Sequence, residues 1–171
     1  MKTTVAKKVS LYGFLTVAAL LFGYVEYLVP LNFIAPGIKL GISNAIILFL
    51  IINKKYKAAI VINIARILLS GLLFATPFSL VFSLSAGLIS TVVMISLSGF
   101  SRIGIVGISA TGGAIHNIVQ ILVAYFTVGD GVIFYLPLLI FVGTFAGIFV
   151  GIFVFILINK LKTNKLFEGI L

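Results

Sequence analysis

The sequence contains no cysteine, no tryptophan, one histidine and only three acidic residues in a chain of 171 residues. Without cysteine the chain has no disulfides, no thiolate metal ligands and no cysteine nucleophile. Charged residues make up 9% of the chain, whereas soluble domains carry about 25%. That leaves too little polar surface to coat a water-soluble globule, so the composition indicates an integral membrane protein.

The scarcity of acidic side chains also limits the available chemistry. The three carboxylates belong to Glu26, Asp130 and Glu168, which are widely separated and cannot form the acidic clusters that hold magnesium on a diphosphate. The glycine-rich stretch 107–113 is not followed by the Lys and Ser or Thr of a nucleotide-binding loop. His116 has no evident acidic partner to orient it toward a serine. We therefore predict no enzymatic activity, no metal ion and no cofactor.

Apolar runs occupy most of the chain. A helix that crosses a bilayer needs about 20 mostly apolar residues, because backbone amides in hydrocarbon must bond within their own segment. We predict an all-α bundle of six such helices in a single domain that covers residues 1–171, with spans at about 9–29, 40–52, 58–75, 78–97, 103–128 and 133–158. The second span is short, and it follows the helix-breaking pair Pro36 and Gly37. Thr76 and Pro77 are typical of an N-cap and a first-turn proline for the fourth span.

Most of the basic residues behind the net charge of +9 lie outside the predicted spans. Lysine and arginine are retained on the cytoplasmic side of a membrane, and six crossings place the following residues on one side: Lys2, Lys7, Lys8, Lys54, Lys55, Lys57, Arg102, Lys160, Lys162 and Lys165. We predict a multi-pass protein of a bacterial-type cytoplasmic membrane with both termini in the cytoplasm. Because the charges follow the membrane topology, we expect no nucleic-acid partner.

Three of the predicted spans carry polar or small side chains at helical spacing. The fifth span has Gly113, His116, Asn117 and Gln120 at i, i+3, i+4 and i+7, which is one face of a helix. The third and fourth spans repeat the pattern with these residues: Asn63, Arg66, Ser70, Ser79, Ser83, Gly87 and Ser90. Since uncompensated polar groups at membrane depth are costly, these faces should point away from lipid.

The expected depths of the polar residues in the membrane bring these groups together. A rise of about 1.5 Å per residue puts Arg66 near the midplane and the polar groups of the fifth span in the outer half of the bilayer. We predict an exterior-facing pocket in which four side chains contact a ligand: Arg66, His116, Asn117 and Gln120. Three further side chains shape or close it: Glu26, Lys39 and Asn44. The positive charges and the start of the second span favour an anionic or strongly polar small molecule.

Structural roles compete with this interpretation. Asn and Ser side chains in membrane helices often bond neighbouring helices; Arg66 can pair with Glu26, and Lys39 can extend to the membrane interface. The sixth span carries a stripe of small residues: Gly143, Gly147 and Gly151. Such stripes predict close helix packing within the bundle. Ala19 and Gly23 form a shorter stripe on the first span, which suits either packing or a docking surface for a partner protein.

Five stretches of the sequence together resemble one known family. They are 23–26, 36–41 with Asn44, Arg66, 82–87 and 116–120. From about residue 11 to residue 157 the chain is similar to the Gx transporter family, whose members also carry the description heptaprenyl diphosphate synthase component I. The resemblance implies a six-helix fold similar to that of the S components, the substrate-binding subunits of energy-coupling factor (ECF) transporters. It further implies a T component and two ATPase subunits as partners, docked through Ala19 and Gly23.

Three hypotheses remain open. The first is a membrane-embedded, S-component-like protein that binds a small vitamin- or cofactor-type molecule for uptake energised by partner ATPases. The second is a membrane subunit associated with isoprenoid (heptaprenyl) diphosphate synthesis, although the scattered acids supply no magnesium site within the chain itself. The third is a non-transporting membrane anchor of a redox or lipid-modifying complex.

Overall fold

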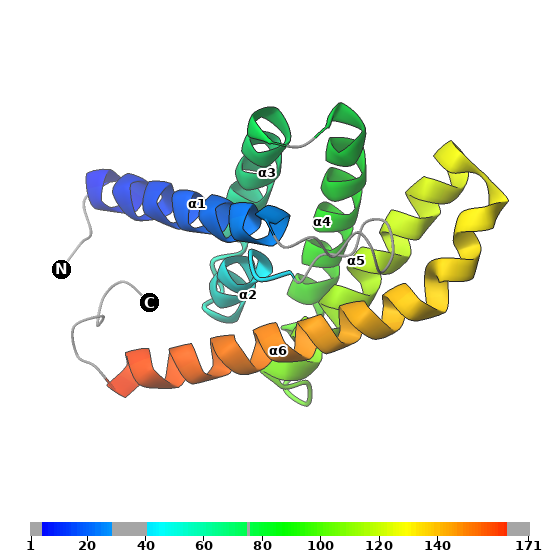
Figure 1. Cartoon of the computed structure of the whole chain (residues 1–171). Helices are drawn as coiled ribbons and strands as arrows, with labels where there is room; N and C mark the ends of the chain where they lie inside the picture. Colours follow the sequence, from blue (N-terminus) through cyan, green and yellow to red (C-terminus); the bar gives the residue numbers. More distant parts are fainter. Residues whose placement is uncertain (1–4, 29–40, 75, 164–171) are drawn as a thin grey trace.

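The computed structural model describes residues 5–28, 41–74 and 76–163, which form helices joined by short turns, with no β-strand among them (Figure 1). The helices, in chain order, are α1 (Val5–Leu28), α2 (Asn44–Ile52), α3 (Tyr56–Leu73), α4 (Pro77–Leu97), α5 (Ile105–Val128) and α6 (Leu136–Thr163). A 3-10 helix, η2 (Asp130–Tyr135), comes directly before α6. The predicted all-α class is confirmed.

Five of the helices are long and apolar enough to cross a membrane: α1, α3, α4, α5 and the α6 segment. Their ends lie within a few residues of the ends of the predicted spans. The predicted sixth span starts inside η2, and α6 itself begins at Leu136. The first turn of α1 and the last turn of α6 lie on the same side of the bundle (Figure 1). The cytoplasmic location of that side stays a prediction.

Helix α2 differs from the predicted second span. It has nine residues and is therefore about 13.5 Å long at 1.5 Å per residue, well short of the roughly 30 Å hydrocarbon core of a bilayer. Six of its side chains are buried: Ala45, Ile46, Ile47, Leu48, Leu50 and Ile51. They pack in a core with α1, α3, α4 and α6, and α2 lies between α1 and α6 in Figure 1. The prediction of six crossing helices is not confirmed, because this apolar segment is a short helix enclosed by the others.

Local signals in the sequence explain where the helices begin and end. The hydroxyl of Thr76 accepts a hydrogen bond of 3.2 Å from the backbone N–H of Ser79, and Pro77 is the first residue of α4. This is the predicted N-cap arrangement. Helix α5 ends at Val128, and the next residue, Gly129, has a φ of +108° in the left-handed region that glycine adopts without strain.

The small residues of α6 pack against α5, as the stripe predicted. A Cβ atom on Gly147 would lie 2.5 Å from the carbonyl oxygen of Ser109, and one on Gly151 would lie 2.7 Å from the Cα atom of Val106. These distances are too short for atoms that are not bonded to each other, so the two backbones can approach this closely only because the residues are glycines. The α5–α6 pair is therefore held in a fixed register.

The stripe on α1 points into the molecule. Ala19 is fully buried in the core around α2, and a Cβ atom on Gly23 would lie 4.0 Å from the Cβ atom of Ser43. Ala19 therefore offers no surface to a partner in this structure. The small side chain suits the close crossing of α1 over α2 instead.

Candidate functional site

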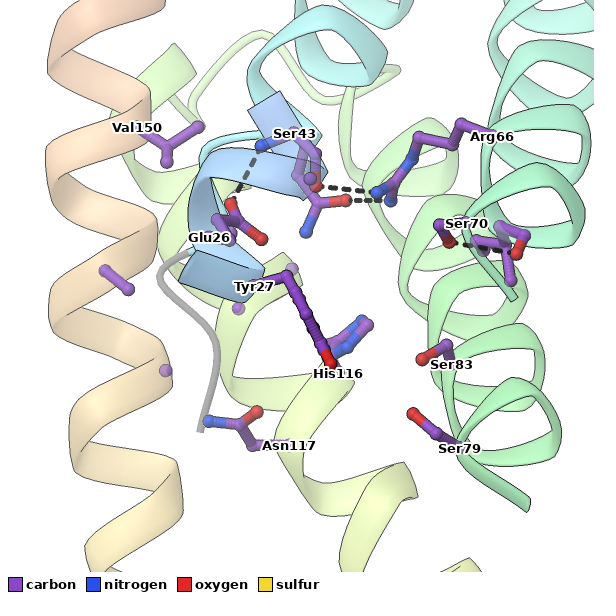
Figure 2. A pocket seen from close by; sticks show the side chains of 18 of the residues that line it. Glu26, Tyr27, Ser43, Arg66, Ser70, Ser79, Ser83, His116, Asn117 and Val150 are labelled. Atoms are coloured by element: carbon purple, nitrogen blue, oxygen red, sulfur yellow. Dashed lines mark hydrogen bonds between the residues drawn. The ribbon is translucent and has the colours of Figure 1, made fainter. Parts of the chain in front are cut away.

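A cavity of about 380 Å³ is lined by residues from each of the helices α1 to α6 (Figure 2). Because α2 is short, its N-terminal end lies inside the bundle, where Ser43 and Asn44 form part of the lining. The volume is within the range of pockets that bind small molecules. The length of α2 thus determines where the bundle leaves space.

Arg66 of α3 lines this cavity, and three hydrogen bonds fix its guanidinium group. Its Nη1 atom donates to the hydroxyl of Ser43 and its Nη2 atom donates to the side-chain oxygen of Asn44, each at 2.6 Å. Its Nε atom donates to Asn63 Oδ1 at 2.9 Å. All three acceptors are uncharged oxygen atoms, and three of the five N–H groups of the guanidinium are used. These three bonds therefore hold the positive charge in position, and none of them is to a carboxylate.

Glu26 of α1 is joined to the same group through the start of α2. Its Oε1 atom accepts a hydrogen bond of 3.0 Å from the backbone N–H of Ser43, whose hydroxyl accepts from Arg66 (Figure 2). A carboxylate at a helix N-terminus satisfies an N–H group that has no partner within the helix and interacts favourably with the helix dipole. Ser43 thus connects the carboxylate of Glu26 in α1 with the guanidinium group of Arg66 in α3.

Asn63 ties this arrangement to α4. It is fully buried, and its Nδ2 atom donates to the carbonyl oxygen of Gly87 at 2.9 Å and to the hydroxyl of Thr91 at 2.8 Å. Its Oδ1 atom accepts from Arg66. Asn63 therefore bonds neighbouring helices, which is the structural role considered for it, and orients Arg66 at the same time.

The remaining polar groups of the cavity come from α3, α4 and α5. Ser70, Ser79 and Ser83 lie on one side of it, and Val150 of α6 lies on the other (Figure 2). His116 and Asn117 of α5 also line the cavity, but the Nδ2 atom of Asn117 donates to the carbonyl oxygen of Leu139 in α6 at 2.6 Å. That bond uses the Nδ2 atom of Asn117 to join α5 and α6.

Of the seven predicted binding residues, five line the cavity: Glu26, Asn44, Arg66, His116 and Asn117. Gln120 is buried but is not among the lining residues. It lies one helical turn beyond Asn117, where the lining contributed by α5 has ended. Lys39 lies outside the described residues. Within the described ranges no group of three His, Asp or Glu side chains could hold a metal ion.

Sequence reasoning did not find Ser43 or Tyr27. Ser43 is central to the site because it bonds both Glu26 and Arg66. Its position just before a helix start, next to Asn44, is a local signal for such a role. Tyr27 lines the cavity beside Glu26 although it is 61% exposed, and an aromatic residue at the end of an apolar segment gave no signal of this position.

A model of the family described as heptaprenyl diphosphate synthase component I matches residues 15–157. The matched range contains every residue found to line the cavity. No curated protein matches the chain, and no solved structure matches it.

Proposed function

The chain belongs to the heptaprenyl diphosphate synthase component I family, and we propose that it is a membrane-embedded binding subunit. Its ligand is a small molecule with a polar or anionic end, held in the cavity around Arg66. The protein acts by binding and positioning this molecule, and partner chains supply any catalysis or energy. We place it in the cytoplasmic membrane with both termini in the cytoplasm.

The observation that carries this proposal is the fixed guanidinium group of Arg66. An arginine at membrane depth is costly, and linking helices needs no charge, since Asn63 achieves this with a neutral amide. Arg66 is instead held by uncharged acceptors at the edge of a cavity that also exposes serine hydroxyls. Such a group binds carboxylates and phosphates through charge-assisted hydrogen bonds.

The family description favours a role in isoprenoid diphosphate synthesis. In this version the chain is the membrane component of a synthase and holds a substrate or product while a partner chain performs the reaction. We propose that the partner provides the magnesium site, because no group of three His, Asp or Glu side chains in the described part of the chain could hold a metal ion. We propose both that such a partner chain binds this protein and that the protein has a surface for it.

An uptake role is the second candidate, and the contribution of every helix to one cavity favours it. Residues from each of α1 to α6 line this space in a single chain, which suits a protein that carries a vitamin- or cofactor-type molecule through a membrane. In this version an ECF-type T component and two ATPase subunits are the partners. Both versions need the same ligand contact at Arg66.

The test is purification in detergent, followed by mass spectrometry of the small molecules and protein chains that remain bound. The compared variants are Arg66→Ala, Arg66→Lys and the matched control Arg102→Ala, which removes an exposed arginine outside the cavity. Loss of a hydrogen-bonded charge lowers affinity by roughly ten- to a hundredfold. We expect Arg66→Ala to lose the bound molecule and Arg102→Ala to retain it.

Arg66→Lys keeps the charge and guards against a folding defect, so it should retain part of the binding. A co-purifying prenyl synthase chain favours the first version, and co-purifying ATPases favour the second. Equal ligand retention in Arg66→Ala and the wild type overturns the proposal. A protein that carries neither ligand nor such partners is better described as an anchor of a redox or lipid-modifying complex.

A further inference from the structure

The cavity around Arg66 holds one side chain of each charge. Among the described residues that line it, Arg66 is the one cation and Glu26 is the one carboxylate. Uncompensated charge is costly in a cavity at membrane depth, because the surroundings solvate it poorly. A ligand with only a negative charge would leave an excess of negative charge among these groups. A ligand with one charge of each sign would keep the cavity neutral.

The two charged groups lie on either side of a single residue, Ser43. Its hydroxyl oxygen accepts from Arg66 Nη1 at 2.6 Å, and its backbone N–H donates to Glu26 Oε1 at 3.0 Å. In Ser43 the path from the accepting oxygen to the donating nitrogen is Oγ–Cβ–Cα–N. In an α-amino acid the path from a carboxylate oxygen to the ammonium nitrogen, O–C–Cα–N, has the same length. The separation of Arg66 and Glu26 therefore suits a carboxylate and an ammonium group on one carbon atom.

Both charged groups also have hydrogen-bonding capacity beyond their contacts with Ser43. The guanidinium group has five N–H groups, and its printed contacts to Asn63, Ser43 and Asn44 use three of them. The second oxygen of the Glu26 carboxylate is turned toward the cavity (Figure 2). A carboxylate can thus bond Arg66 while an ammonium group beside it bonds Glu26, each through charge-assisted hydrogen bonds.

We infer that the ligand is a zwitterion of the α-amino acid class, whose carboxylate binds Arg66 and whose ammonium group binds Glu26. This inference rests on the proposed function and adds the class of the ligand and its second charged contact. The rest of the molecule lies in the remainder of the cavity, where Ser70, Ser83 and Leu80 are among the lining residues. A zwitterion fits the uptake version better than the synthase version, because a diphosphate has no positive charge to place beside Glu26.

The first test uses the full wild-type chain in phosphatidylcholine nanodiscs and titrates it with each of the common L-amino acids by calorimetry. The amino acid that binds most tightly is then compared with two analogues that keep its side chain, the carboxylic acid without the amino group and the amine without the carboxyl group. Each analogue loses one charge-assisted hydrogen bond, so we expect it to bind roughly ten- to a hundredfold more weakly. This comparison does not depend on how any variant folds.

The second test changes Glu26 alone. Glu26→Gln removes the negative charge but keeps a side-chain oxygen that can accept the N–H of Ser43. We expect it to weaken binding of the amino acid about tenfold or more and to abolish the preference for the amino acid over its analogue without the amino group. Asp130→Asn is the matched control, because it removes an exposed carboxylate that does not line the cavity, and it should bind like the wild type.

The two proposals fail in different ways. If the analogue without the amino group binds the wild type as tightly as the amino acid does, the ligand is a simple anion and only the zwitterion inference is overturned. Equal effects of Glu26→Gln and Asp130→Asn overturn it as well, as does the absence of saturable binding by every amino acid. If the amino acid and its carboxylic acid analogue bind Arg66→Ala as tightly as the wild type, the proposed function itself is wrong.

Discussion

Two helix backbones touch through glycines on the α5–α6 side of the cavity, where the amide of Asn117 adds one bond to Leu139. On the α3–α4 side the buried amide of Asn63 joins the helices instead. At Gly147 there is no room for even one methyl group beside the backbone of Ser109. At Asn63 the helices are joined by side-chain hydrogen bonds to Gly87 and Thr91. Close backbone contact fixes α5 and α6 but offers few binding groups, while the hydrogen-bonded side also holds Arg66 in place. The α5–α6 side therefore fixes how closely two helices approach, and the α3–α4 side holds the positive charge of the cavity.

The largest effect is expected from a methyl group on the glycine side. In Gly147→Ala the new Cβ would lie 2.5 Å from Ser109 O and 2.8 Å from Ala110 Cα, and both are backbone atoms that cannot move aside alone. Forced separation of the helices should cost roughly 3 kcal/mol and lower the melting temperature in detergent by roughly 5–10 °C.

The control for this change is Gly13→Ala in α1, where nothing lies within 4 Å of the added Cβ atom. Thermal unfolding of this variant should match that of the wild type or occur at a slightly higher temperature, because alanine favours the helix. Similar losses of stability in the two variants would show that α5 and α6 are not in the close contact described.

A smaller effect is expected on the hydrogen-bonded side. Asn63→Ala removes the bonds to Gly87, Thr91 and Arg66. Hydrogen bonds between membrane helices contribute modestly, so the free energy of unfolding should fall by about 1 kcal/mol. Denaturation in mixed micelles measures this change. Ligand affinity should also fall, but less than in Arg66→Ala, because the bonds from Arg66 to Ser43 and Asn44 remain.

Ser70→Ala is the control on the same helix. The Ser70 hydroxyl bonds the carbonyl oxygen of Ile67 in its own helix, so its removal breaks no contact between helices and should leave stability unchanged. If Ser70→Ala is as destabilising as Asn63→Ala, the hydrogen bonds of Asn63 to α4 do not stabilise the α3–α4 pair as argued.

The smallest effect is expected at the start of α4. Thr76→Ala removes the hydroxyl that accepts the N–H of Ser79, and an exposed cap of this kind contributes about 0.5–1 kcal/mol. The melting temperature should fall slightly and be restored in Thr76→Ser. Thr127→Ala is the matched control, because that exposed hydroxyl bonds only carbonyl oxygens of its own helix. Equal shifts in the two variants would contradict the capping role.

Several features of the site could be predicted from the sequence because they depend on spacing within one helix. The spacing of Arg66 and Ser70, and that of His116 and Asn117, put each pair near one face, and all four line the cavity. Gln120 has the same spacing but does not line it. The difference arises because a shared face says nothing about how far along the helix the cavity extends.

The roles of individual polar residues could not be predicted in this way. Asn117 lines the cavity, where its predicted contact with ligand stays a prediction, and its Nδ2 atom also donates to the carbonyl oxygen of Leu139 in α6. Ser43 was not among the predicted binding residues, although it links Glu26 with Arg66. These roles depend on contacts between residues far apart in the chain, which spacing along a single helix does not specify.

The helical, apolar and membrane-suited character of the chain follows from its amino-acid order, because runs of apolar residues and scarce charges leave few other structures. The same order also determined the cap at Thr76 and the close approach at Gly147, which depend on local chemistry and on the absence of a side chain. The packing of the helices, in contrast, makes the second apolar segment a short buried helix and brings its N-terminal end to Arg66. In helices that are apolar on all sides, hydrophobicity does not distinguish the face toward lipid from the face toward protein. That choice is made by the way the helices pack.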